Sequence, residues 1–247
     1  MKSPARNSAV AFTLIELLTV ISIIAVLAGL LFPAISAVRE AARKAAAKND
    51  ESQIVTAIKA YYVEYGKYPM TTGTNSYFGP SMPGTLTGSN SSVGNSSMIL
   101  DVLRYNTGGT NSAIVSSTSS TSLNPRQVVF LDAPTVKNTG QPYSGVIPNS
   151  PTGTTKIGCW YDPWGSEYNI LVNGNYDNTL VNPYTDTPGG PTISTGVLCW
   201  SFGKNGVLGG GPAAAKGFSS ESGVLNNYYT TPGNSSTPTT GDVISWQ

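Results

Sequence analysis

Apolar residues are spread very unevenly along this chain of 247 residues. One apolar run extends from Phe12 to Val38, and Glu16 is its only acidic residue. Its uncharged part, Leu17 to Ile35, is close in length to the stretch of about 20 apolar residues that a helix needs to cross a bilayer. Lys2 and Arg6 precede the run, which predicts an amino terminus in the cytoplasm and export of everything after Val38. The run is too long for a cleaved secretory signal peptide.

The helical pattern continues beyond the apolar run. An alanine-rich stretch follows, and its mixture of charges is typical of a solvated helix. These charged residues are Arg39, Glu40, Arg43, Lys44, Lys48, Asp50 and Glu51.

An apolar face then recurs at helical spacing through Ile54, Ile58, Tyr61 and Tyr65. Gly66 predicts the end of the helix at Tyr65. We therefore expect one helix from Phe12 to Tyr65. Its first half would span the membrane, and its second half would carry a globular head.

The remainder of the chain has the composition of strands and long polar loops. The stretch from Met70 to about Pro125 is rich in Ser, Thr, Gly and Asn, with one short helix expected at Ser97 to Tyr105. All four tryptophans follow it, which favours a small antiparallel sheet in an α+β fold. The expected strands are Val128 to Leu131, Lys156 to Tyr161, Tyr168 to Val172 and Val197 to Phe202.

The composition excludes several kinds of site. Lys plus Arg is 14 and Asp plus Glu is 13, so the chain lacks the excess of positive charge that nucleic-acid binding requires. It has no histidine, which removes Ser-His-Asp and Cys-His catalysis and every His-ligated metal site. Asp162 and Glu167 flank a D-P-W-G turn and are interpreted as turn residues rather than as an acid–base pair. We therefore expect no enzymatic activity.

The two cysteines occupy similar local sequences, because Cys159 and Cys199 each precede a tryptophan. If their strands are neighbours, the sulfurs could meet, and an exported chain favours oxidation. Such a disulfide would contribute about 4 kcal/mol in the chain-entropy model. The alternative is two buried free thiols.

The string A-F-T-L-I-E-L-L-T-V-I-S-I-I-A-V-L-A-G-L-L-F-P resembles the class III signal of type IV pilins and type II secretion pseudopilins. This resemblance implies that a prepilin peptidase cuts between Ala11 and Phe12 and methylates the new amino group of Phe12. It makes Glu16 the residue that directs assembly, by pairing with the amino group of a neighbouring subunit. It also places Pro33 where filaments of the family often lose helical order. Ala11 departs from the family, which prefers Gly before the cut.

Three further strings look more narrowly like the major pseudopilin: Y-D-P-W-G-S-E-Y, S-F-G-K-N-G and G-D-V-I-S-W. With them, the resemblance divides the chain into a leader (1–11), a membrane and filament-core segment (12–38), an amphipathic continuation (39–69) and a periplasmic head (70–247). The regions 70–157 and 207–240 match the family poorly and are interpreted as enlarged loops.

Major pseudopilins hold one Ca²⁺ in a loop near the carboxyl end, and the resemblance transfers this site to three residues. The ligands would be the carbonyl of Phe202, the side chain of Asn205 and the carboxylate of Asp242. Calcium prefers six to eight oxygens, and Asn205 stands where the family has Asp, so we expect a weakened site. The alternative is a loop closed by hydrogen bonds alone.

The function implied by the resemblance is mechanical. Subunits would leave the inner membrane and stack through their helices into a periplasmic pseudopilus that drives protein export by a type II secretion system. The partners implied are further copies of the chain, the prepilin peptidase, the inner-membrane assembly platform, minor pseudopilins and membrane lipid. Two alternatives remain: a type IV pilin or minor pilin with adhesive loops, and a membrane-anchored binding module.

Overall fold

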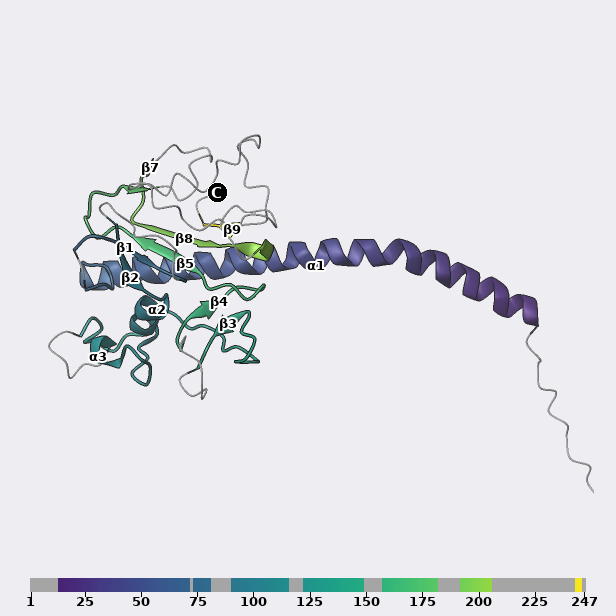
Figure 1. Ribbon diagram of the computed structural model, residues 1–247, viewed down its shortest axis with the longest axis horizontal. Helices are drawn as coiled ribbons and strands as arrows, with labels where there is room; N and C mark the ends of the chain where they lie inside the picture. The colour runs from purple at the N-terminus through teal and green to yellow at the C-terminus, as the bar shows by residue number, and fades with distance from the viewer. Residues whose placement is uncertain are drawn as a thin grey trace, which may run out of the picture. The chain divides into compact units, whose positions relative to one another are not determined.

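The structure is a computed structural model that describes residues 13–71, 73–80, 90–115, 122–148, 157–181, 192–205 and 243–245. The chain divides into two compact units, Met1–Ala42 and Arg43–Gln247. One helix, α1 (Leu14–Tyr65), begins in the first unit and ends in the second (Figure 1).

Helix α1 ends where the sequence predicts. The Gly66 amide donates a hydrogen bond of 2.8 Å to the carbonyl of Tyr62. Gly66 has a φ of 66°, the left-handed conformation that glycine adopts without strain just beyond a helix. Pro33 lies inside α1, so the helix does not end there.

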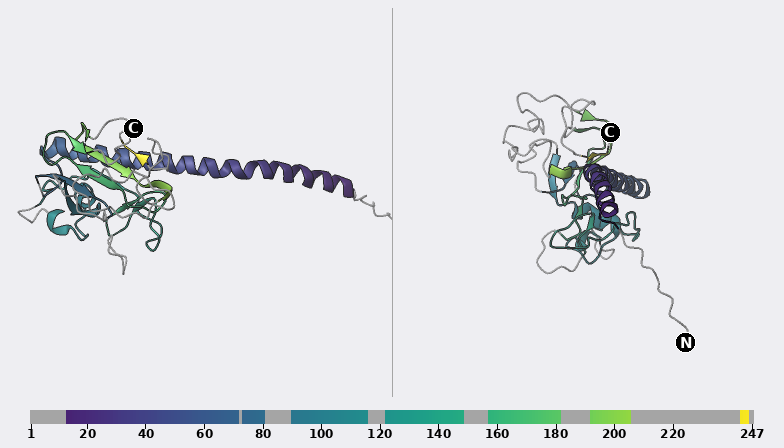
Figure 2. Two further views of the ribbon diagram at one scale, coloured as in Figure 1. Left: turned by 45° about the horizontal axis from the view of Figure 1, so that its top comes forward. Right: turned by 90° about the vertical axis from the view of Figure 1, so that its right-hand side faces the viewer.

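The main sheet of the second unit has five strands in the order β2-β1-β5-β8-β9 (Figures 1 and 2). The pairs β1–β5, β5–β8 and β8–β9 are antiparallel, whereas β2 lies parallel to β1 at one edge. A long helix with a small, mainly antiparallel sheet confirms the α+β expectation. The five strands of this sheet are Asn75–Phe78 (β1), Asn90–Gly94 (β2), Asn169–Val172 (β5), Val197–Ser201 (β8) and Val243–Ile244 (β9).

Shorter elements surround this sheet. The helix expected near residue 97 is present as α2 (Ser97–Arg104), with the left-handed Tyr105 at its end. The others are α3 (Ser112–Val115), the pair β3 (Gly145–Val146) and β4 (Trp160–Tyr161), the pair β6 (Leu180–Val181) and β7 (Thr192–Ile193), and the 3-10 helix η1 (Gly203–Asn205).

The core of the second unit forms between α1 and one face of the sheet. Ile54, Ile58 and Tyr61 of α1 are fully buried, as their helical spacing predicts, and they share an apolar cluster with Ile170 and Val172 of β5. Alternate strand residues point to the same face, which is why these two β5 side chains reach the helix together. The buried rings of Trp160 and Trp200 confirm that the tryptophan-rich stretch supplies much of the interior.

The strand expected at Val128–Leu131 does not form. The amides of Phe130 and Leu131 both donate to one carbonyl, that of Leu103 at the end of α2, at 2.8 and 3.2 Å. This extended segment is thus held by a helix end rather than by a strand. Conversely, region 70–157 contains β1, β2, α2 and β3, and is more regular than its loop-like composition suggested.

Candidate functional site: the first part of helix α1

The first turn of α1 is closed by two polar side chains. The carboxylate of Glu16 accepts hydrogen bonds from the Thr13 amide (2.8 Å) and the Thr13 hydroxyl (2.6 Å). In return, the Glu16 amide donates to the Thr13 hydroxyl oxygen at 3.3 Å. This reciprocal arrangement is a capping box, which satisfies amide groups that have no partner within the helix. Glu16 therefore has a defined position and hydrogen-bond donors within its own chain.

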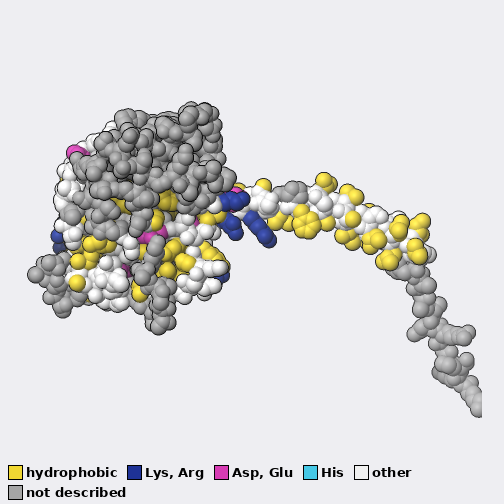
Figure 3. All heavy atoms as spheres, in the orientation of Figure 1, with side chains coloured by type: hydrophobic (Ala, Val, Ile, Leu, Met, Phe, Trp, Pro, Cys, Tyr) yellow, Lys and Arg dark blue, Asp and Glu magenta, His cyan; other side chains and the backbone are white. Residues whose placement is uncertain are grey.

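The large apolar residues of α1 on both sides of Glu16, from Leu14 to Val38, are exposed. Leu14 is 82% exposed and Phe32 is 74% exposed, and the most apolar window of α1 has no buried residue. Figure 3 shows apolar side chains covering this part of the helix. Helix α1 is long and apolar enough to cross a membrane, which is compatible with a single-pass anchor.

The charged stretch after the apolar run differs in part from the expectation. Arg39, Arg43, Lys44 and Lys48 are exposed, as a solvated helix predicts. Glu51, however, is fully buried, so the expectation was wrong for this residue. It lies three residues before Ile54 on the helix face that enters the core, and sequence reasoning missed it although the spacing was visible.

The expected processing site and most of the expected calcium site lie outside the described residues. Ala11, Phe12 and Asp242 fall there, as does the side chain of Asn205. Phe202 is half-buried and precedes η1. Over the ranges described, no group of three acidic or cysteine side chains is arranged to hold a metal ion.

A chain of hydrogen bonds connects the start of η1 and the end of β8 to Asp162. The Gly203 amide donates to the hydroxyl oxygen of Ser201 at 2.9 Å, and the Ser201 hydroxyl donates to the carboxylate of Asp162. Asp162 also accepts from the amides of Trp164 (2.9 Å) and Ser166 (2.8 Å). Burial raises the pKa of Asp162, and these hydrogen bonds oppose the rise. The D-P-W-G turn is thereby attached to the end of β8.

The expected disulfide is absent: Cys159 and Cys199 are free and buried. Cys199 lies on β8 opposite Ile170, whereas Cys159 directly precedes β4, which pairs with β3 in a different sheet. The two residues also belong to separate apolar clusters. Burial, followed by the nearby Glu167, raises the pKa of Cys159 to about 12, so this thiol is inert as a nucleophile.

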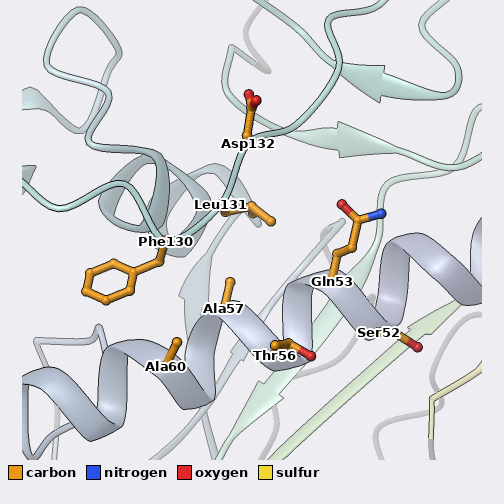
Figure 4. A pocket seen from close by; sticks show the side chains of 8 residues that line it. All are labelled: Ser52, Gln53, Thr56, Ala57, Ala60, Phe130, Leu131 and Asp132. Atoms are coloured by element: carbon orange, nitrogen blue, oxygen red, sulfur yellow. The ribbon is translucent and has the colours of Figure 1, made fainter.

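A groove of about 420 Å³ lies between α1 and the extended segment 130–132 (Figure 4). Its only titratable side chain is Asp132, so its lining does not supply an acid–base pair. The lining residues are Ser52, Gln53, Thr56, Ala57, Ala60, Phe130, Leu131 and Asp132.

Sequence reasoning identified Glu16 but missed its partner Thr13. The signal was present, because Thr followed three residues later by Glu, directly before an apolar run, is the pattern of a capping box. No protein-family model, curated protein or solved structure matches this chain.

Proposed function

We propose that this chain is a filament-forming, pilin-like subunit, most similar to the major pseudopilin of a type II secretion system. The observation that carries the proposal is a single acidic residue, Glu16, at the start of a helix whose first apolar stretch, residues 14–38, is left exposed by the described part of its own chain. Lipid would cover this surface before assembly, and the same helix of other copies would cover it afterwards.

Glu16 would determine how neighbouring helices pair in the filament. A carboxylate within an apolar layer is unfavourable unless it is paired. In the proposed filament, its partner is the methylated amino group of Phe12 on a neighbouring subunit, released when the prepilin peptidase removes residues 1–11. The remaining proposed partners are the inner-membrane assembly platform and the minor pseudopilins. The head would lie in the periplasm.

Replacing Glu16 tests this proposal directly. We expect Glu16→Ala to leave membrane-bound monomers and few filaments, because insertion depends on the apolar run and stacking depends on the carboxylate. Glu64→Ala is the matched control, since Glu64 is an exposed acid on the same helix that pairs with Arg126. Normal filaments from Glu16→Ala would refute the pairing.

The processing step has its own test. Mass spectrometry of the native protein should find a chain that begins at Phe12 and carries one methyl group on its amino terminus. An intact Met1, or a start near residue 38, would exclude the class III assignment.

The long insertions rich in Ser, Thr and Asn favour a second candidate, a type IV pilin with adhesive loops. Surface labelling of intact cells distinguishes the two functions. A surface pilin is labelled, whereas a short periplasmic filament is not.

A further inference from the structure

Glu51 occupies an unusual position for an acidic residue. It lies on α1, three and seven residues before the core residues Ile54 and Ile58, and its exposed fraction is zero. Outside its own helix, the groups that interact with it are the backbone of Ser201 and the Cys199 thiol, both on β8, together with Asp162 and the Tyr168 hydroxyl. Its carboxyl group is therefore enclosed where α1 meets the end of β8.

This carboxyl group lacks the partners that a buried charge requires. Within the described part of the chain, neither of its oxygens has a hydrogen-bond partner. The Ser201 backbone lies close enough to lower the pKa of Glu51, but it does not reach hydrogen-bond geometry. A buried, ionised carboxylate without a partner is strongly unfavourable, and such a group is accommodated by binding a proton instead.

The charged groups around Glu51 come from several elements: two acids oppose its ionisation and one lysine favours it. Asp50 on the same helix and Asp162 in the turn after β4 are both acidic and raise its pKa. Lys48, one turn earlier, is exposed and lowers it. Burial is the largest influence and brings the pKa of Glu51 to about 9.

The two neighbouring acids are already stabilised by donors. Asp50 accepts from the hydroxyl of Tyr168 at 2.9 Å, and Asp162 accepts from Ser201 and two backbone amides. Among these three carboxyl groups, Glu51 alone accepts no hydrogen bond of acceptable geometry from the residues that the structure describes. It is therefore the member of the cluster that should hold a proton.

We propose that Glu51 is a proton-binding site that makes the docking of β8 on α1 dependent on pH. In the neutral acid form, the carboxyl group fits the apolar contact. When solvent hydroxide removes the proton, the resulting carboxylate must reach water, and the contact between α1 and the end of β8 opens. This inference concerns the head alone and does not depend on the proposed filament function.

The direction of the pH effect follows from proton linkage. The pKa of Glu51 is raised from 4.5 when unfolded to about 9 when folded, so the folded state binds the extra proton between these values. The contribution of Glu51 to the free energy of unfolding is therefore complete below the unfolded pKa, and it decreases as the pH rises towards the folded pKa. The chain has no histidine, so the residue type that normally titrates between pH 6 and 8 does not contribute.

The test is chemical unfolding of the full chain in detergent micelles at several pH values from 5.5 to 9, followed by fluorescence of the buried Trp160 and Trp200. For the wild type, we expect the folding equilibrium constant to fall by up to about tenfold for each pH unit. Glu51→Gln, which keeps the shape of the neutral acid, should remove most of this dependence. Glu64→Gln, a surface control on the same helix, should retain it.

Hydrogen exchange at pH 9 locates the opening. Amides of β8 should lose more protection in the wild type than in Glu51→Gln, while amides of α2 should behave alike in both. Equal exchange of β8 in the two proteins would contradict the local opening.

Other outcomes would overturn the proposal. A flat wild-type profile would mean that Glu51 is ionised and paired when folded, and this result requires no variant to fold. If Glu51→Gln does not fold, Glu51→Leu provides a second neutral side chain. If Ca²⁺ stabilises the wild type at pH 8 relative to chelator and Glu51→Gln abolishes this effect, the site binds a cation rather than a proton.

Discussion

The carboxylate of Glu167 caps helix α2 from a position 71 residues away from Ser96. One of its oxygens accepts hydrogen bonds from the Ser96 amide (2.8 Å) and the Ser96 hydroxyl (2.7 Å), all in the interior. Ser96 itself makes no side-chain capping bond to the helix. A negative charge at a helix amino terminus is favourable, so Glu167 takes the place of the missing local cap.

Replacing Glu167 with Ala should therefore destabilise the head. The amide and hydroxyl of Ser96 would lose their acceptor while buried, which costs about 1–3 kcal/mol. Chemical unfolding followed by tryptophan fluorescence measures this change. Glu64→Ala serves as control, because its surface ion pair with Arg126 contributes at most about 1 kcal/mol. Equal effects of the two substitutions would show that the cap has no special importance.

A second prediction concerns Tyr61, which is fully buried and donates a hydrogen bond to the carbonyl of Leu123. Tyr61→Phe keeps the ring but leaves that carbonyl without this donor, and should lower the free energy of unfolding by about 1–2 kcal/mol. Tyr62→Phe alters a tyrosine that is 39% exposed and should have little effect. If both variants unfold alike, the hydroxyl of Tyr61 does not stabilise the core.

The free thiols give a third prediction. In the native protein, Cys159 and Cys199 should resist alkylation because both are buried and burial raises the pKa of each. After denaturation without reductant, mass spectrometry should find both thiols alkylated, and reductant should not change the melting temperature. A denatured chain that alkylates only after reduction would instead demonstrate a disulfide.

The fourth prediction tests the proposed calcium site formed by Phe202, Asn205 and Asp242. If the site binds Ca²⁺, added Ca²⁺ raises the melting temperature, because a ligand that binds only the folded state stabilises it. Asp242→Ala should abolish that rise, whereas Glu64→Ala should preserve it. Identical melting of the wild type in Ca²⁺ and in chelator would exclude the site.

The elements that could be predicted from the amino-acid sequence are those whose signal is local. The period of Ile54, Ile58 and Tyr61 defined the buried helix face, and Gly66 defined the end of α1, because helix periodicity and a left-handed glycine act within a few residues. The β-branched and apolar runs at β5 and β8 likewise identified both strands. The position of Glu16 in the apolar run is also visible in the sequence. The capping pattern of Thr13 and Glu16 is equally local, although it was not predicted.

Contacts between distant groups depend on how the whole chain folds, and they were not predictable from local patterns. The segment around Phe130 has strand composition, yet it binds the end of α2, because an extended segment becomes a strand only where another lies alongside. Cys159 and Cys199 have similar local sequences, yet Cys199 lies in the main sheet whereas Cys159 directly precedes β4 of a different sheet. The burial of Glu51 depends on where β8 crosses α1, and the capping of α2 depends on where Glu167 reaches Ser96. These are contacts between segments far apart in the chain, and no local pattern encodes them.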